Sequence, residues 1–267
     1  MNTSVSRDSS RLTATPGLLF DLDGVLTPTA EVHMRAWSRL FNDFLSARGD
    51  QQPYTERDYF EHVDGKPRYD GVRDMLASRG ITLPEGTPDD SPDLETVCGL
   101  GNRKNSVFAA ELDENGVEPY PGSVAFLDRA IALGYSVAVV SSSRNAVPVL
   151  EAAGIRDRFD HIVDGVVAAA EGLPGKPAPD TYLEGARRLG LSAAECVVVE
   201  DAQSGVEAGR RGRFGLVLGV DRGVGAAALL SNGADFVVDD LAEVVDSLAQ
   251  QPSPTTTDST TAPEHSE

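Results

Sequence analysis

Short apolar runs alternate with longer amphipathic stretches along most of the chain. Five runs rich in Val and Leu predict buried strands, at residues 18–20, 136–140, 197–199, 216–218 and 236–238. Stretches with helical periodicity follow most of these runs, at about 122–133, 145–153, 179–189, 203–211 and 241–249. Because strands that alternate with helices form parallel sheets, the pattern predicts an α/β protein with a Rossmann-like parallel-sheet core.

The segment between the first two strands has a different pattern. Residues 30–118 contain no convincing strand and predict helices over 30–47, 55–62, 69–79 and 93–114, the last interrupted near Gly99 and Gly101. We interpret this segment as an inserted all-helical cap subdomain, with the core formed by residues 16–29 and 119–250. Residues 1–15 and the acidic segment 251–267 are polar and lack apolar periodicity, so both are predicted to be disordered tails.

Composition limits the classes of function. Of the 267 residues, 40% are hydrophobic, which is enough for a full-sized core. The 42 acidic residues outnumber the 23 basic ones and give a net charge of −19, which disfavours binding to nucleic acid. The sequence has no membrane-spanning run, no secretory signal and only two cysteines, of which Cys196 is predicted to be buried. We therefore expect a cytoplasmic protein, monomeric rather than oligomeric, with no membrane partner.

Polar side chains follow three of the predicted strands at the point where each strand ends. Asp21 and Asp23 come after the first strand, Ser141–Ser143 after the second, and Glu200 with Asp201 after the third. Lys176 lies in a loop that precedes a predicted helix. Because the carboxyl ends of parallel strands meet at one edge of a sheet, these side chains are expected to converge there.

This combination of residue types suits phosphoryl transfer. Clustered carboxylates provide the oxygen ligands that Mg²⁺ prefers, and a carboxylate beside Mg²⁺ can attack a phosphoryl group. A second acid can exchange protons with a hydroxyl group, while a lysine and a serine hold the phosphoryl oxygens. Taken one at a time, the same motifs are also typical of a turn, a helix cap, a solvated helix start and a surface lysine. Their convergence at one edge favours a site.

The residues 20–27 (FDLDGVLT) resemble motif I of the haloacid dehalogenase superfamily. Ser141, Lys176 and the pair Glu200-Asp201 resemble motifs II, III and IV, and the resemblance extends over about residues 17–221. It implies that Asp21 is the nucleophile and that Asp23 is the general acid and base. It also implies that Mg²⁺ is bound by the side chains of Asp21, Glu200 and Asp201 together with the main-chain carbonyl of Asp23.

A narrower resemblance is to the β-phosphoglucomutases. It rests on residues 29–37 (TAEVHMRAW), 65–68 (GKPR), 102–105 (NRKN) and 141–145 (SSSRN). It implies that Arg68 binds the distal phosphate and that Lys104 faces the substrate. The full set of candidate phosphate and substrate ligands is Gly65, Arg68, Lys104, Ser141, Ser143, Arg144, Asn145, Lys176 and His33. Pro28 and Lys66 depart from the family pattern, as does a longer segment between Trp37 and Gly65, and these departures concern the identity of the sugar more than the chemistry.

Three functions are compatible with these motifs. The first is a Mg²⁺-dependent β-phosphoglucomutase that converts β-glucose 1-phosphate to glucose 6-phosphate, with glucose 1,6-bisphosphate as intermediate and activator. The second is a phosphatase with the same core, in which water replaces the sugar hydroxyl as acceptor. The third is a noncatalytic module that binds phosphosugars, which is disfavoured because Asp21, Asp23, Lys176 and Asp201 are all present. In each case the expected partner is a small phosphosugar.

Overall fold

A sheet of parallel strands lies at the centre of residues 11–251, the part of the chain that a computed structural model describes. Within these residues the sheet has six strands in the order β3-β2-β1-β4-β5-β6. β1 pairs with both β2 and β4, so that Leu18 lies opposite Val137 and Val197. The α/β class predicted from the sequence is thus confirmed. The strands are β1 (Gly17–Phe20), β2 (Ser136–Val140), β3 (His161–Val163), β4 (Cys196–Glu200), β5 (Leu216–Val220) and β6 (Phe236–Val238).

Helices cover both faces of the sheet, which explains why its strands are almost continuously apolar. Phe20 packs into a cluster with residues of α6 (Pro121–Ala132), α7 (Ala146–Ala152) and the 3₁₀ helix η4 (Leu241–Ser247). Leu19 points to the opposite face, into a cluster with residues of α9 (Asp180–Arg188), α10 (Gln203–Arg211) and α11 (Ala226–Asn232). Three short helices complete this part of the chain: η2 (Arg156–Arg158), α8 (Gly165–Glu171) and η3 (Ala193–Glu195).

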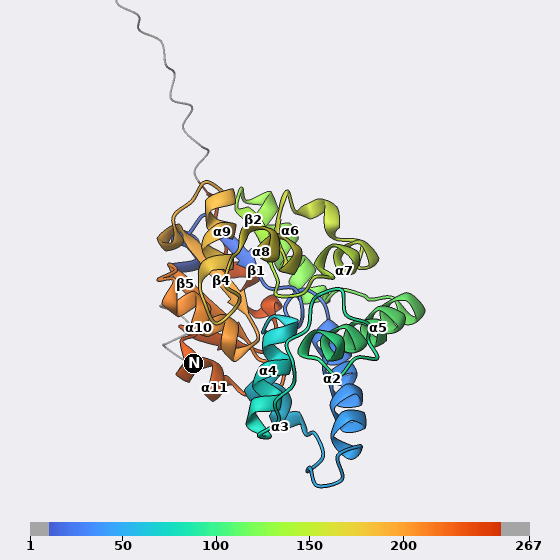
Figure 1. The fold of residues 1–267 in the computed structure, drawn as a ribbon. Coiled ribbons are helices and arrows are strands. Elements are labelled where there is room, and N and C mark those ends of the chain that lie inside the picture. The colour runs from blue at the N-terminus through green and yellow to red at the C-terminus, as the bar shows by residue number, and fades with distance from the viewer. Residues whose placement is uncertain (1–10, 252–267) are drawn as a thin grey trace, which may run out of the picture.

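Residues 29–115, which lie between β1 and α6, form a second, helical body beside the sheet, coloured blue to green in Figure 1. It consists of α2 (Thr29–Ser46), α3 (Glu56–Asp58), η1 (Tyr59–Val63), α4 (Arg68–Ser78) and α5 (Val97–Asn115). We call residues 29–115 the cap and the remaining described residues the core. The cap has its own apolar cluster, which includes Trp37, Phe41, Met75 and Leu100.

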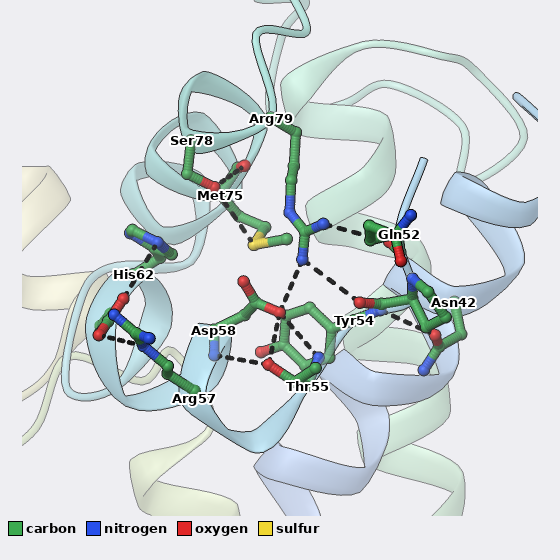
Figure 2. Close-up of polar contacts among 12 residues, drawn as sticks. Asn42, Gln52, Tyr54, Thr55, Arg57, Asp58, His62, Met75, Ser78 and Arg79 are labelled. Atoms are coloured by element: carbon green, nitrogen blue, oxygen red, sulfur yellow. Dashed lines mark hydrogen bonds and ion pairs between the residues drawn. The ribbon is translucent and has the colours of Figure 1, made fainter. Parts of the chain in front are cut away.

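A polar cluster inside the cap holds the loop between α2 and α3 (Figure 2). The guanidinium of Arg79 donates to the carbonyl oxygens of Gln52 and Pro53, at 3.2 and 3.3 Å, and to Asp58 Oδ2 at 2.7 Å. Asp58 also forms a reciprocal capping box with Thr55 at the start of α3. One half-buried arginine thus joins the loop, α3 and the end of α4.

Several helix and strand predictions need correction. β3, α8 and α11 were not predicted because each is only three to seven residues long and none shows a clear period. The predicted interruption near Gly99 and Gly101 is wrong, because α5 is continuous. A Cβ on Gly101 would lie 2.7 Å from the Tyr69 ring, so this glycine permits close packing between α5 and α4 rather than breaking the helix.

The predicted N-terminal tail ends earlier than residue 15. Residues 11–14 are helical, and Leu12 is fully buried in the core cluster while its carbonyl accepts from the Tyr135 hydroxyl at 3.1 Å. One well-anchored leucine thus orders a segment whose composition is polar. Residues 1–10 and 252–267 lie outside the described residues, as do most of both predicted tails.

Two expectations from the composition concern membrane-spanning segments and the two cysteines. No helix between residues 11 and 251 is both long enough and apolar enough to cross a lipid bilayer. Cys98 and Cys196 are free and buried, and Cys196 is packed among the strands and helices of one sheet face, as predicted.

Candidate active site

The polar residues predicted to converge at one edge of the sheet do so. Asp21 follows β1 directly, and its amide still donates to Val199 of β4 at 2.9 Å. Ser141 follows β2, and Glu200 is the last residue of β4 with Asp201 next to it. Extension of the strand pairing therefore holds the backbone of Asp21 at the sheet edge.

The ammonium group of Lys176 lies at the centre of this edge and is almost completely buried. It donates to Asp21 Oδ1 at 2.5 Å, to Glu200 Oε1 at 2.6 Å and to the carbonyl of Val140 at 3.1 Å, which uses all three of its hydrogens. Although burial disfavours the charged form, the charges of Asp21 and Glu200 raise the pKa of Lys176 above its ordinary value. Lys176 therefore remains positive and holds the two carboxylates in place.

Three carboxylates form a compact group suited to a cation. One oxygen each of Asp21, Glu200 and Asp201 lies within 4.8 Å of the others. Burial, together with the neighbouring carboxylates, raises the pKa of Asp21 and of Asp201 well above its ordinary value. Oxygen donors with this excess of negative charge fit Mg²⁺. Two glycines leave them room, because a Cβ on Gly205 would lie 1.7 Å from Glu200 Oε1 and one on Gly24 would lie 1.8 Å from Asp201 Oδ2.

Asp23 is held by residues of α2. The Thr29 hydroxyl donates to Asp23 Oδ1 at 2.5 Å, and His33 Nε2 lies 3.3 Å from the same oxygen. The hydroxyl of Ser141 lies 3.4 Å from the other carboxylate oxygen. Although burial disfavours ionisation, His33 and Thr29 lower the pKa of Asp23 to about 2. Asp23 is therefore a carboxylate at neutral pH, able to accept a proton.

A link of buried side chains runs from Asp23 into the cap. Lys104 of α5 contacts His33 Nδ1, and the His33 ring stacks on Phe108 with a distance of 4.1 Å between ring centres. Burial and the charge of Arg68 lower the pKa of Lys104 to about 7. Burial and the charge of Lys104 likewise lower the pKa of His33. The cap thus supplies a cationic group close to the carboxylates of the core.

Arg68 lies in the first turn of α4. Its guanidinium is linked to the core through the side chain of Asn105 in α5. One terminal nitrogen donates to Asn102 Oδ1 at 3.3 Å and the other to Asn105 Oδ1 at 2.7 Å. Asn145, in the core loop after β2, donates to the same oxygen of Asn105 at 2.7 Å. Burial and the charge of Arg144 lower the pKa of Arg68. Both arginines line the cleft between cap and core.

Two serine hydroxyls of the core bind the cap loop that precedes α4. Ser142 donates to the carbonyl of Gly65 at 2.7 Å, and Ser204 donates to the carbonyl of Asp64 at 2.9 Å. Gly65 has a positive φ of 68°, and a Cβ there would lie 2.4 Å from the Ser204 hydroxyl, so only glycine fits this approach. The neighbouring Lys66 pairs with Asp74 of α4 at 2.6 Å.

A cleft with about 630 Å³ of empty space, open to solvent at its mouth, lies between cap and core. Of the residues singled out from the sequence, its lining includes Asp21, Asp23, His33, Gly65, Arg68, Lys104, Ser143, Arg144, Asn145 and Asp201. Three of the predicted residues do not line the cleft: Ser141, Lys176 and Glu200. They lie beneath it, where Ser141 contacts Asp23 and Lys176 joins Asp21 to Glu200. The hydroxyl of Ser143 accepts from the Asn145 amide at 3.1 Å and so shapes the loop after β2.

Some residues of the cleft were not predicted from the sequence. Thr29 holds Asp23, Asn105 accepts from Arg68, and Asp64 lines the cleft beside Gly65. Burial raises the pKa of Asp64 to about 7. Asp64 and Asn105 adjoin residues that were singled out, so position in the same motif was an available signal. Thr29 likewise begins the run 29–37 that was singled out, although its contact with Asp23 was not predicted.

Comparison with known proteins shows which family this chain resembles in sequence and in fold. A protein-family model described as haloacid dehalogenase-like hydrolase matches residues 15–213. A β-phosphoglucomutase of Mycobacterium bovis is 47% identical over 237 residues, covering 85% of this chain and 90% of that protein. Hexitol phosphatase A of Escherichia coli is 30% identical over 199 residues, covering 72% and 77%. A crystal structure of a β-phosphoglucomutase from Clostridium difficile matches with a TM-score of 0.68 at 26% identity, covering 86% and 92%.

Proposed function

Because the chain belongs to the haloacid dehalogenase-like hydrolase family and to its β-phosphoglucomutase-like branch, we propose that it is a Mg²⁺-dependent mutase converting β-glucose 1-phosphate to glucose 6-phosphate. Family membership makes it an enzyme that transfers or hydrolyses phosphoryl groups. One observation supports the mutase in particular. Basic groups lie at two separate places: Lys176 beneath the cleft, where it contacts Asp21, and Arg68 with Arg144 in the cleft lining.

The proposed reaction proceeds in two phosphoryl transfers. Asp21, phosphorylated on its carboxylate, gives its phosphoryl group to the C6 hydroxyl of β-glucose 1-phosphate, and glucose 1,6-bisphosphate forms. The bisphosphate turns over, and Asp21 attacks the phosphorus at C1, so that the bond from C1 oxygen to phosphorus breaks and glucose 6-phosphate leaves. Asp21 is then phosphorylated again, and the atoms balance.

Asp23 carries the proton in both transfers. Its low pKa makes it a carboxylate at the outset, so it removes the proton of the C6 hydroxyl during attack. The same carboxyl then returns that proton to the C1 oxygen as this oxygen leaves. The Thr29 hydroxyl binds one of its oxygens, which leaves the other, 3.4 Å from the Ser141 hydroxyl, to exchange the proton.

The phosphoryl group under transfer is bound by fixed positive charge and by hydroxyl groups. On the core side Lys176 supplies the positive charge beside Asp21, and Ser141 supplies a hydroxyl group beside Asp23. Mg²⁺, held by the carboxylates of Asp21, Glu200 and Asp201 and by the carbonyl of Asp23, would neutralise the phosphoryl oxygens. The compact group of three carboxylates supports this cation requirement.

The second phosphate of the bisphosphate needs its own site, away from Asp21. Arg68, Arg144 and Asn145 supply donors there, from cap and core together. The hydrogen bonds of Ser142 and Ser204 to the cap loop hold cap and core together around the substrate. Closure of the mouth of the cleft over bound substrate would then exclude water, which would otherwise hydrolyse the aspartyl-phosphate.

A phosphatase is the second candidate, and the similarity to hexitol phosphatase A favours it. Its first half-reaction is the same, because Asp21 takes a phosphoryl group from the substrate. Water then replaces the sugar hydroxyl as acceptor. The residues at the sheet edge suit both reactions, so the two candidates differ only in what the closed cleft admits.

A coupled assay separates the two functions. Purified protein is given Mg²⁺, β-glucose 1-phosphate and a trace of glucose 1,6-bisphosphate, and glucose 6-phosphate and free phosphate are followed in parallel. A mutase forms glucose 6-phosphate without releasing phosphate, and Asp21→Asn abolishes the reaction. Release of phosphate that outpaces isomerisation would contradict the mutase and favour the phosphatase. Light scattering on the same preparation tests the expected monomer.

A further inference from the structure

Two arginines in the cleft have no acidic partner. Arg68 comes from the cap and Arg144 from the core, and across residues 11–251 neither forms an ion pair with a carboxylate. Arg68 and Arg144 line the same cleft. A chain with a net charge of −19 thus leaves two neighbouring guanidinium groups without an anion at one point. Such a point attracts a dianion.

Two asparagines of α5 take the place of an anion there. Asn102 and Asn105 are three residues apart and therefore lie on one face of the helix. Their side-chain oxygens accept from the two terminal nitrogens of Arg68, at 3.3 and 2.7 Å. Asn105 Oδ1 also accepts from Asn145 of the core at 2.7 Å. One neutral oxygen thus receives donors from both sides of the cleft.

The two asparagines differ in how firmly they are held. The amide nitrogen of Asn102 donates to the carbonyls of Pro88 and Asp90, at 3.0 and 2.9 Å, so its side chain cannot turn without losing both bonds. For Asn105, the described part of the chain offers its amide nitrogen no hydrogen-bond acceptor. Asn105 is therefore the asparagine whose side chain can turn away from Arg68.

We propose that Asn105 Oδ1 is a placeholder for an oxygen of the substrate's distal phosphate, occupying the donors of Arg68 and Asn145 until that phosphate displaces it. This inference rests on the second phosphate site of the proposed function. Before substrate binds, Asn105 keeps Arg68 and Asn145 aimed at one point across the cleft. Asn102 keeps its hold on Arg68 throughout. An amide oxygen is a weaker acceptor than a phosphate dianion, so the exchange favours the substrate.

The two obvious substitutions should act in opposite directions. Asn105→Ala removes an acceptor that the phosphate has to displace, so the bisphosphate should bind more tightly, by about fivefold as an order-of-magnitude expectation for the net contribution of a hydrogen bond. Asn105→Asp puts a carboxylate on Arg68 and repels the phosphate, so binding should weaken at least tenfold, an order-of-magnitude expectation for a charged hydrogen bond. A residue with a merely structural role would weaken binding in both variants.

The experiment measures the dissociation constant of glucose 1,6-bisphosphate by calorimetry, with Mg²⁺ and in the Asp21→Asn background so that no turnover occurs. Asn115→Ala is the matched control, since Asn115 is an exposed asparagine near the end of the same helix. Its substitution should leave the dissociation constant unchanged. Thermal melting of each variant identifies any loss of binding that comes from unfolding.

The outcomes distinguish the inference from the function on which it rests. Tighter binding in Asn105→Ala with weaker binding in Asn105→Asp supports the placeholder. Weaker or unchanged binding in Asn105→Ala overturns it, because Asn105 would then contact the substrate or serve the fold. If Arg68→Ala leaves bisphosphate binding unchanged, the second phosphate site of the proposed function fails, and the placeholder fails with it.

Discussion

Replacing Lys176 with Met should destabilise the protein mainly through the two carboxylates that it leaves behind. In the wild type the ammonium lies 2.5 Å from Asp21 Oδ1 and 2.6 Å from Glu200 Oε1, and all three groups are buried. Removing one partner of a buried ion pair costs about 3–5 kcal/mol, because the other charge stays buried without compensation. Methionine keeps most of the side-chain volume, so little of the effect comes from a cavity. We expect a loss near the upper end of this range, about 4–5 kcal/mol, at pH 7.5 without Mg²⁺.

The loss should depend on pH with a definite sign. Burial already raises the pKa of Asp21, and Lys176 opposes that rise. Without Lys176 the folded protein binds protons at this site more readily than the unfolded chain does, so its stability recovers as pH falls. Urea unfolding of wild type and Lys176→Met at pH 7.5, 6.5 and 5.5 should give a difference in unfolding free energy that shrinks with each step. Mg²⁺ should shrink it as well, since a cation offsets the same carboxylates.

Lys66→Met is the matched control, because Lys66 pairs with Asp74 on the cap surface, where the side chain of Asp74 is 52% exposed. Its loss should cost at most about 1 kcal/mol and should not vary over this pH range. A cost for Lys176→Met below about 1 kcal/mol, or one that stays constant between pH 5.5 and 7.5, would refute the charge balance described for the sheet edge.

Three further predictions follow from the cleft. Arg68→Ala should weaken binding of glucose 1,6-bisphosphate by about 2–3 kcal/mol, as for the loss of a charged hydrogen-bond donor. It should affect hydrolysis of p-nitrophenyl phosphate less, since that compound has no second phosphate. Gly205→Ala should lower Mg²⁺ affinity in a calorimetric titration, because its Cβ would lie 1.7 Å from Glu200 Oε1. Gly190→Ala is the control and should leave that affinity unchanged, because a Cβ on Gly190, whose φ is 72°, would meet no atom within 4 Å. Lys104 has a pKa of about 7, below its value in an unfolded chain, so wild-type stability should rise with pH from 7 to 9 in urea unfolding, and Lys104→Met should lose this rise.

The catalytic and metal-binding candidates at the carboxyl ends of the strands could be found from the sequence, because each stands directly at the end of a predicted strand. Each of Asp21, Ser141 and Glu200 ends or follows an apolar run, and parallel strands bring such ends together whatever the length of chain between them. β3 could not be found this way. His161 begins β3, a three-residue strand that lies outermost on one side of the sheet. Only its pairing with β2, where His161 lies opposite Ala138, makes it a strand.

The cap residues depend on how two bodies meet, which no local pattern records. Thr29 gains its role because α2 starts beside Asp23, and Asn105 gains its role because it meets Asn145 of the core as well as Arg68. Helix propensity was misleading at Gly99 and Gly101, where the absence of side chains serves close packing against Leu94 and Tyr69. Tertiary contacts therefore decided the features that the sequence-based interpretation missed or misread.

The position of β1 has a consequence for synthesis on the ribosome. β1 is the central strand and emerges first, yet Gly17 pairs with Ser136 on one side and with Cys196 on the other. The whole cap, residues 29–115, leaves the exit tunnel before either partner strand does. Because the cap has its own apolar cluster, it can fold while β1 is still unpaired. The insertion thus sets the order in which the parts become available during translation, with the cap before β2 and the second partner of β1 only when β4 has been made.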